Sequence, residues 1–356
     1  MKKTMLTSFI LASLLWVSAC KSPVVPPEKQ RTPREYTWTK TGLGEYTYPF
    51  DIWGSSPENV YLVADSPYLF TGKIWHFDGN EWADISAVYT ESFPVANPGK
   101  QAYQWTVWRI WGFGPDDVWI AGVRDTTGNN NLTDLTGFVM RYHGGVWREI
   151  AIEGAVHLFC IGGNSPNDVW VAGSYGKIFH YNGSSWTPYT VPDSILVSQY
   201  LGNLGQKTYL WGANLGSGDG REYLSLLEWD GVSWSIAEVA DAPPYLTYDV
   251  PVIIENEFYS AVGTQVRKRI APYVWEPIFD VPGVELRRVG GLSSTNMLAV
   301  GGPGEHIVHY NGENAQRLTI QSADSSIYYY DVLMFETEAF AIGRISASTG
   351  YVLHGK

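Results

Sequence analysis

Short β-rich segments alternate with turn residues along most of the chain. In the plainest examples a first segment ends near glycine, a turn of Ser, Pro, Asn and Asp follows, and a second segment ends in a small residue. Four copies are clear, namely Asp51–Ala64, Arg109–Gly122, Cys160–Gly173 and Arg288–Gly301. Weaker copies end at Gly212, Gly263 and Gly343. Such self-similarity indicates a repeat architecture.

A second half-motif follows each copy. An aromatic residue precedes Asp-Gly, Asn-Gly or Gly-Gly, and a new segment starts near Trp, as in Ile74–Trp82, Met140–Trp147, Ile178–Trp186 and Leu227–Trp234. These dipeptides accept the positive φ angles of tight hairpins. Each repeat is therefore predicted to hold four antiparallel strands, called A to D in chain order, which make the blade of a β-propeller.

The repeat count and the two chain ends predict how the ring closes. Seven strand-B ends, at residues 64, 122, 173, 212, 263, 301 and 343, predict seven blades in an all-β propeller. The chain stops after a strand C, Tyr351–Lys356, whereas Tyr36–Lys40 resembles a stray strand D. The N-terminal strand is therefore predicted to complete the last blade, which would remove an open sheet edge.

The motifs resemble the repeats of bacterial exported propellers with WGSSPNDVW-type blades. They are also kelch-like, because a glycine after strand B is followed by Tyr and then Trp. They depart from the kelch pattern in two ways: the gap from Tyr181 to Trp186 is short, and a double glycine after strand B is mostly absent. The resemblance covers nearly all of the chain after the N-terminal apolar segment and its tether. It implies a propeller fold but gives almost no information on function, because propellers carry many activities.

The N-terminus predicts export and a lipid anchor. Lys2 and Lys3 precede an apolar stretch that is short for a membrane span and suits a secretory signal. The stretch ends in Val17-Ser18-Ala19-Cys20, which resembles the lipobox of bacterial lipoproteins. The resemblance implies a signal peptide over residues 1–19, acylation of Cys20, and a stable anchor. Residues 20–35 are proline-rich and charged, so they predict a tether before a propeller over residues 36–356.

The charge and the cysteine content of the chain limit the kinds of partner that it is expected to bind. Without Lys2 and Lys3 the chain has 22 basic and 36 acidic residues, a net charge of −14. Nucleic acid is therefore a poor partner. Lys21, rather than Asp, follows Cys20, so the outer membrane is favoured over the inner one by resemblance to the lipoprotein sorting rule. Cys160 is expected to be a buried, inert thiol, and the protein is expected to be a monomer that contacts the membrane only through its anchor.

Residues that recur at one blade position are interpreted as structural. Trp119 and Trp170 share one position, and Trp82, Trp147, Trp186 and Trp234 share another, where large rings would pack between blades. His76, His180 and His309 share a third. One histidine per blade would lie far from the next, so these three are not expected to bind one metal ion.

Binding residues are expected where the blades differ. The long insertions are B–C loops (Asp65–Lys73, Val123–Gly137, Ala213–Glu222) or D–A loops (Ser86–Gln104, Ala237–Tyr248), and strand order brings all five to one face. Their aromatic and charged residues are the candidate ligand- or partner-binding residues: Tyr68, Phe70, Tyr89, Phe93, Tyr103, Arg124, Asp125, Asp219, Arg221, Tyr223 and Tyr245. These residues either contact a ligand or pack the loops onto the disc.

Cofactor and catalytic motifs are weak. The loop from Arg124 to Leu135 has the oxygen-rich composition of a calcium site, but also that of an ordinary loop, and no cofactor or catalytic residue is assigned. The glycine-rich segment from Gly216 to Gly220 lacks the lysine of a phosphate loop. No serine-hydrolase elbow, zinc-protease helix or Cys-x-x-Cys pair is present.

Three functions remain open at this point. The leading hypothesis is an envelope lipoprotein that binds a glycan or another envelope protein through its loop-rich face. The alternative is a hydrolase acting on glycans, with two carboxylates near the mouth of the channel. The third is an architectural assembly factor without a small ligand. The sequence alone favours a binding role over an enzyme.

Overall fold

The computed structural model describes residues 35–66, 71–88, 105–125, 135–191, 197–215, 222–241, 250–304, 306–320, 326–345 and 349–356. The chain divides into Met1–Thr32 and a compact unit, Pro33–Lys356, and the fold described below is that of the second. Within the described ranges, no helix has the length and apolar character needed to cross a bilayer.

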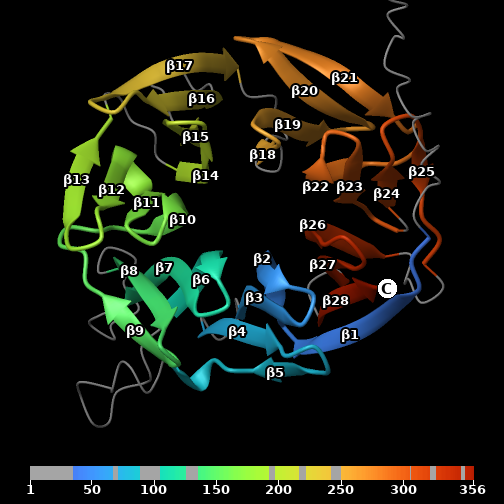
Figure 1. The fold of residues 1–356 in the computed structure, drawn as a ribbon, viewed down its shortest axis with the longest axis horizontal. Helices are drawn as coiled ribbons and strands as arrows, with labels where there is room; N and C mark the ends of the chain where they lie inside the picture. The colour runs from blue at the N-terminus through green and yellow to red at the C-terminus, as the bar shows by residue number, and fades with distance from the viewer. Residues whose placement is uncertain are drawn as a thin grey trace, which may run out of the picture. The chain divides into compact units, whose positions relative to one another are not determined.

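The compact unit is an all-β propeller whose sheets surround a central opening (Figure 1). Five sheets have four strands each. The first three of them are β10(Leu158–Ser165)–β11(Asp168–Gly173)–β12(Lys177–Tyr181)–β13(Trp186–Thr190), β14(Val197–Leu204)–β15(Lys207–Leu215)–β16(Glu222–Trp229)–β17(Trp234–Asp241) and β18(Val252–Ile254)–β19(Glu257–Val262)–β20(Gln265–Ala271)–β21(Val274–Asp280). The others are β22(Leu286–Ser293)–β23(Asn296–Gly301)–β24(Ile307–Tyr310)–β25(Ala315–Arg317) and β26(Ile327–Met334)–β27(Ala339–Ile345)–β28(Thr349–Gly355)–β1(Trp38–Glu45). A short 3-10 helix, η2(Ser174–Gly176), joins β11 to β12.

The sixth sheet has eight strands. It contains β2(Tyr48–Ser56), β3(Asn59–Ser66), β4(Thr71–Phe77) and β5(Trp82–Asp84), followed by β6(Trp105–Gly114), β7(Asp117–Asp125), β8(Leu135–His143) and β9(Val146–Ile150). Its two halves are joined through one parallel residue pair, Thr71 with Trp105. The propeller fold predicted from the sequence is thus confirmed, while the number of blades depends on how this sheet is divided.

The two ends of the compact unit pair in one sheet. Strand β1 runs antiparallel to β28, with Trp38 opposite Gly355 and Thr41 opposite Val352. Backbone hydrogen bonds of 2.9 and 3.2 Å between Thr37 and Lys356 extend the ladder. The N-terminal strand therefore closes the ring as the chain ends predicted, and it covers an edge that would otherwise be open.

A polar pair links strands B and C at an equivalent place seven times among the described residues. In each pair, the first residue lies at or just before the start of strand B. It contacts the strand-C residue that is paired with the strand-B residue two positions later. The nitrogen and oxygen atoms lie 2.5–3.0 Å apart in Asn59–His76, Asp117–Arg141, Asp168–His180, Lys207–Glu228, Glu257–Lys268, Asn296–His309 and Glu338–His354. The three recurrent histidines of the sequence belong to this series, so their recurrence has a structural cause.

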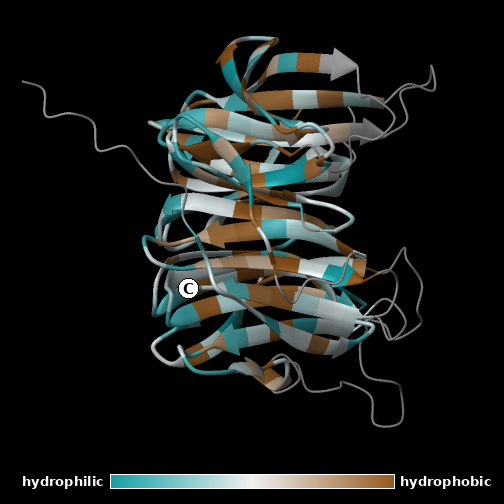
Figure 2. Cartoon of the chain, turned by 90° about the vertical axis from the view of Figure 1, so that its right-hand side faces the viewer, coloured by the Kyte–Doolittle hydropathy of each residue, from teal (hydrophilic) through white to brown (hydrophobic). Residues whose placement is uncertain are grey.

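The recurrent tryptophans pack between neighbouring sheets, as the sequence predicted. Trp82 on β5 meets Phe340 on β27 edge to face, and Trp234 on β17 meets Trp170 on β11 in the same way, with centroids 6.2 and 5.3 Å apart. Trp170 also donates its indole hydrogen to Asp168 over 3.2 Å. Figure 2 shows how apolar residues alternate with polar ones along the strands.

Several strands extend into segments that the sequence assigned to loops. Strand β17 runs to Asp241, β7 runs to Asp125, and β15 runs to Leu215. The residues concerned carry no proline or glycine that would break the ladder, so pairing continues to the next turn residues. The loop boundaries at 237, 123 and 213 were therefore wrong by several residues. The strand ends beside all five predicted insertions still lie on one side of the ring, called here the loop side, because A strands begin there and B strands end there.

Candidate functional site: a cationic pocket in the central channel

Six inner strands, β2, β6, β10, β14, β22 and β26, carry a bulge at an equivalent place. The extra residues, called here the bulge residues, are Phe50, Trp108, Phe159, Gln199, Arg287 and Tyr330. The next residues along the chain, called here the inner-ring residues, are Asp51, Arg109, Cys160, Tyr200, Arg288 and Asp331. A bulge redirects side chains next to it. Here this brings side chains from several sheets together at the axis.

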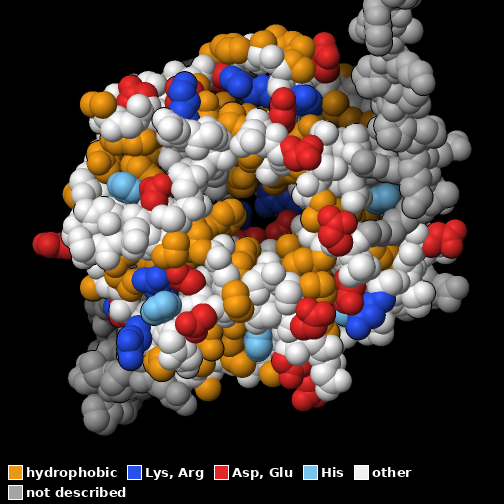
Figure 3. Space-filling view, viewed as in Figure 1, with side chains coloured by type: hydrophobic (Ala, Val, Ile, Leu, Met, Phe, Trp, Pro, Cys, Tyr) orange, Lys and Arg blue, Asp and Glu red, His pale blue; other side chains and the backbone are white. Residues whose placement is uncertain are grey.

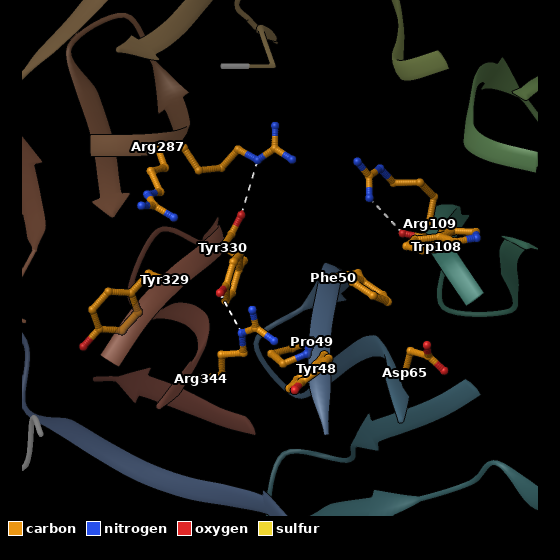
Figure 4. A pocket seen from close by; sticks show the side chains of 11 residues that line it. Tyr48, Pro49, Phe50, Asp65, Trp108, Arg109, Arg287, Tyr329, Tyr330 and Arg344 are labelled. Carbon is orange, nitrogen blue, oxygen red and sulfur yellow. Dashed lines mark hydrogen bonds between the residues drawn. The ribbon is translucent and has the colours of Figure 1, made fainter. Parts of the chain in front are cut away.

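The larger cavity at the axis, called here the mouth pocket, has a volume of about 480 Å³. Its walls come from the beginnings of β2, β6, β22 and β26 and the ends of β3 and β27, so it lies on the loop side. The lining residues are Tyr48, Pro49, Phe50, Asp65, Trp108, Arg109, Arg287, Arg288, Tyr329, Tyr330 and Arg344 (Figure 4). Four arginines and five aromatic rings thus share one pocket.

Arg344 is held rigidly against two of these rings. Its guanidinium carbon lies 4.0 Å from the ring centre of Tyr48 and 5.3 Å from that of Tyr330. Its Nε donates to the hydroxyl of Tyr330 over 2.7 Å. The hydrogen bonds of Arg344 within the described ranges use Nε only, so both terminal nitrogens are left to face a ligand. A stacked and oriented guanidinium is suited to bind carboxylate or phosphate through two parallel hydrogen bonds.

The other arginines of the pocket are anchored differently. Arg287 pairs with Glu285, 2.8 Å away, while Arg109 donates to the carbonyl oxygens of Trp108 and Gln199 over 2.9 and 3.2 Å. Basic side chains are visible deep within the central opening in Figure 3. A chain with a net charge of −12 therefore concentrates positive charge at its axis. Low-dielectric walls around such a cluster focus its field on entering anions.

A second, smaller cavity continues the channel. This inner cavity has a volume of about 120 Å³ and is lined by all six inner-ring residues together with Gln199 and apolar side chains. Arg109 and Arg288 line both cavities, so the two are adjacent. Burial raises the pKa of the Cys160 thiol to about 12, which fits the inert thiol expected from the sequence.

Two carboxyl groups meet in the inner cavity. Asp51 and Asp331 both line it, and Oδ2 of Asp51 accepts from the backbone nitrogen of Ile110 over 2.8 Å. Burial raises the pKa of Asp51 well above its usual value; the charge of Arg109 opposes the rise and that of Asp331 adds to it. Asp51 therefore takes up a proton more readily than an exposed aspartate does.

Asp65 is a titratable residue in the wall of the mouth pocket. Its side chain is 7% exposed, and burial raises the pKa of the carboxyl group from 3.8 to about 6, although hydrogen bonds from Ser66 and Thr106 oppose the rise. In the described structure its Oδ1 atom is buried without a hydrogen-bond partner. Ionising such a group costs more than it does in water.

The raised pKa of Asp65 predicts a pH-dependent loss of stability. Below the unfolded pKa near 3.8 the carboxyl group is neutral in both states; as the pH rises towards 6, only the unfolded chain ionises readily, so folding becomes less favourable. Asp65→Asn should therefore be about 1–3 kcal/mol more stable than the wild type above pH 6 and similar to it at pH 4. Urea denaturation at several pH values measures this. A constant difference between the two proteins across the range would contradict it.

The structure places three of the eleven candidate residues. Arg124, at the end of β7, forms a two-point pair with Glu149, with distances of 3.0 and 2.7 Å. Asp125 is fully buried, because β7 continues through it. Tyr223 is half-buried near the start of β16. The remaining candidates lie outside the described residues: Tyr68, Phe70, Tyr89, Phe93, Tyr103, Asp219, Arg221 and Tyr245, as does Cys20.

The sequence-based candidates all came from the long loops, so the residues of the channel site were not predicted. The repeats nevertheless contain a pattern that points to them. Among the four clear repeats the first residue changes from Asp51 to Arg109, Cys160 and Arg288, whereas the residue after it is always Ile or Val. A variable position beside constant ones is where blades can differ without a change of fold.

The described residues hold no group of three or more His, Cys, Asp and Glu side chains placed to bind a metal ion. Residues 126–134, which gave the loop after Arg124 its calcium-like composition, lie outside the described part of the chain.

Comparison with solved structures shows the fold. The chain is similar to YCF48 bound to the D1 peptide, with a TM-score of 0.59 and 13% identity over 91% of this chain and 97% of that one. It is also similar to the Pan2 WD40 domain of Neurospora crassa (TM-score 0.56, 13% identity, 89% and 95% covered) and to the WD40 propeller of Doa1 (TM-score 0.56, 10% identity, 90% and 97% covered). No known family and no curated protein sequence matches the chain.

Proposed function

We propose that this protein is a lipid-anchored envelope module that binds a segment of a partner protein in the mouth pocket on its loop side. The observation that carries the proposal is the stacked Arg344, whose terminal nitrogens face a pocket with three further arginines. A pocket of about 480 Å³ is in the range that holds a compact ligand or a few residues of an extended chain.

The charge of the pocket favours an acidic peptide over a neutral glycan. A neutral sugar could stack on Tyr48 or Trp108, but it would leave the terminal nitrogens of Arg344 without a charged acceptor in a partly dehydrated site. Asp or Glu side chains, or a terminal carboxylate, would satisfy them. YCF48, a propeller of similar fold, was solved with a peptide bound. That likeness supports a peptide ligand for this chain without identifying one.

We also propose that export, the anchor and the tether follow the N-terminal pattern. The lipobox-like sequence before Cys20 supports acylation there, and Lys21 supports the outer membrane. The proline-rich residues up to 35 would then hold the propeller away from the bilayer. Mass spectrometry of the native protein for a diacylglyceryl cysteine at its N-terminus tests the anchor directly.

We further propose that the eight-stranded sheet is two blades, which gives seven. Each half has four strands in the order found in the separate sheets, and only the pair of Thr71 with Trp105 joins them. The seven B–C polar pairs and the bulges on both β2 and β6 support the same division. We also propose that the repeats are kelch-like.

Arg344→Met is expected to weaken binding of acidic peptides about ten- to a hundred-fold, because hydrogen bonds to charged groups contribute about 1.5–3 kcal/mol. The probe is a fluorescein-labelled hexapeptide library rich in Asp and Glu, and the readout is fluorescence anisotropy. A library with Asn and Gln at the same positions should bind poorly to the wild type.

Arg148→Met is the matched control, because Arg148 is exposed on β9 and lies outside the mouth pocket. It should bind the acidic library like the wild type. Equal losses in both variants, or equal binding of the two libraries, would refute the pocket as the site.

The hydrolase alternative gains no support from the inner cavity. A glycosidase needs carboxyl groups about 5–5.5 Å apart for retention or about 6.5–9.5 Å apart for inversion. Asp51 and Asp331 line the inner cavity of about 120 Å³, which is well below the roughly 300 Å³ at which typical ligand pockets begin. Binding is therefore the function that the site supports best.

A further inference from the structure

We infer that the inner cavity is a second binding site, which takes a small oxoanion, a carboxylate or a phosphate- or sulfate-type group, between Arg109 and Arg288. The two guanidinium groups come from β6 and β22, which lie on opposite flanks of the neighbouring strands β2 and β26. They line a cavity of about 120 Å³, which is enough for one such group.

Arg288 has hydrogen-bonding capacity to spare. Its Nε and one terminal nitrogen reach the carbonyl oxygens of Tyr330 and Val250 only over 3.4 Å, and the carboxylate of Asp331 is 4.0 Å from its Nε. These contacts are at the long end for hydrogen bonds and ion pairs. A buried guanidinium with such weak partners gains from an anion that approaches within normal hydrogen-bond distance.

The charges in the inner cavity leave a positive surplus. The raised pKa of Asp51 favours the neutral form of its carboxyl group, so Asp51 offsets less of the charge of the two arginines than an exposed aspartate would. The remaining groups that face the cavity from β10 and β14 are the thiol of Cys160 and the phenol of Tyr200, and burial raises the pKa of each to about 12. Both are therefore neutral at ordinary pH, and the surplus stays uncompensated by the inner ring.

Neutral polar atoms complete the site. The hydroxyl oxygen of Tyr200, which lines the cavity, accepts from the backbone nitrogen of Ile253 over 3.1 Å, so its own hydrogen is available as a donor. An oxoanion in this position would thus meet donors from β6, β14 and β22.

The anion could be free in solution or could be the acidic end of the segment proposed for the mouth pocket, because both cavities share Arg109 and Arg288. The shared chemistry is a carboxylate or a similar oxoanion. Only the second source depends on the proposed function, so the test uses free anions first.

Equilibrium dialysis of the full-length protein with radiolabelled sulfate, and separately with acetate, tests the site at fixed ionic strength. Saturable binding of one of these anions to the wild type is expected. Arg288→Met should weaken it about ten-fold or more, corresponding to about 1.4 kcal/mol, whereas Arg148→Met, at an exposed residue outside both cavities, should bind like the wild type. Arg288→Lys and Tyr200→Phe provide milder changes in case Arg288→Met does not fold, and circular dichroism checks each variant.

The pH dependence gives an independent measurement. Sulfate keeps its charge above about pH 4, so any loss of binding at high pH reports on the protein. Binding to the wild type should weaken as Asp51 loses its proton, while Asp51→Asn, which cannot ionise at that position, should bind across the range. Absence of saturable binding, or equal effects of Arg288→Met and Arg148→Met, would overturn the inference. Acidic peptides could still bind in the mouth pocket in that case, so the two failures are distinguishable.

Discussion

Trp38→Ala is expected to lower the free energy of unfolding by about 3–5 kcal/mol, the range for removal of a large buried aromatic side chain. Trp38 is 8% exposed and belongs to a buried cluster that includes Val300, Leu318 and Leu353. It also packs so closely over Gly355 that a Cβ there would lie 3.0 Å from its ring. The residue thus joins the closing strand both to β28 and to the adjacent sheet.

Chemical denaturation followed by tryptophan fluorescence measures the loss, and far-ultraviolet circular dichroism checks that the variant folds. Trp38→Phe keeps a ring in place and should lose much less. Trp82→Ala, at a half-buried residue on β5, is the control for removing a tryptophan elsewhere. An unchanged unfolding midpoint for Trp38→Ala would mean that closure by β1 contributes little to stability.

Gly173→Ala is the second change expected to have a large effect, about 3 kcal/mol or more, at the upper end for overpacking. A Cβ at Gly173 would lie 2.0 Å from the carbonyl oxygen of His157 and 2.7 Å from that of Val156. Both contacts are backbone atoms at the start of the inner strand, so no side chain can turn aside. The strand itself would have to move.

Gly114→Ala is the matched control, because a Cβ at Gly114 meets nothing within 4 Å. It should change stability by less than about 0.5 kcal/mol. Differential scanning calorimetry of the two variants compares them with the wild type. Similar melting temperatures for both would show that strand B and the inner strand can separate at no cost, contrary to the geometry.

The close approach at Gly173 also explains why so much of the fold could be predicted from the sequence. Strand B has a glycine at the equivalent place again at Gly122, Gly301 and Gly343, where a Cβ would come within 1.8–2.5 Å of a carbonyl oxygen in or just before the inner strand. Because the constraint is a backbone contact inside every such sheet, it recurs with the period of the repeat. The turn dipeptides and the N-terminal strand at Trp38 could also be recognised from short stretches of sequence.

The channel site could not be predicted in this way. Whether Arg109 points to the axis or into a sheet depends on a one-residue bulge before it, and a shift of one residue reverses the direction of every later side chain. Arg344 lies one residue beyond the repeat motif, and its role depends on Tyr48, which is almost the whole chain length away. Only the closed ring brings these residues together, and most of the loop candidates lie outside the described residues.

The inner-ring residues also bear on how such a protein can acquire new partners. Six inner strands each contribute one such side chain to the axis, and its residue type differs from strand to strand although the bulge beside it recurs. A point mutation at one of these positions would therefore alter the chemistry of the channel at a place where the strands already carry different side chains. Duplicated copies of the gene could diverge in ligand preference through a handful of such exchanges, with the scaffold inherited unchanged.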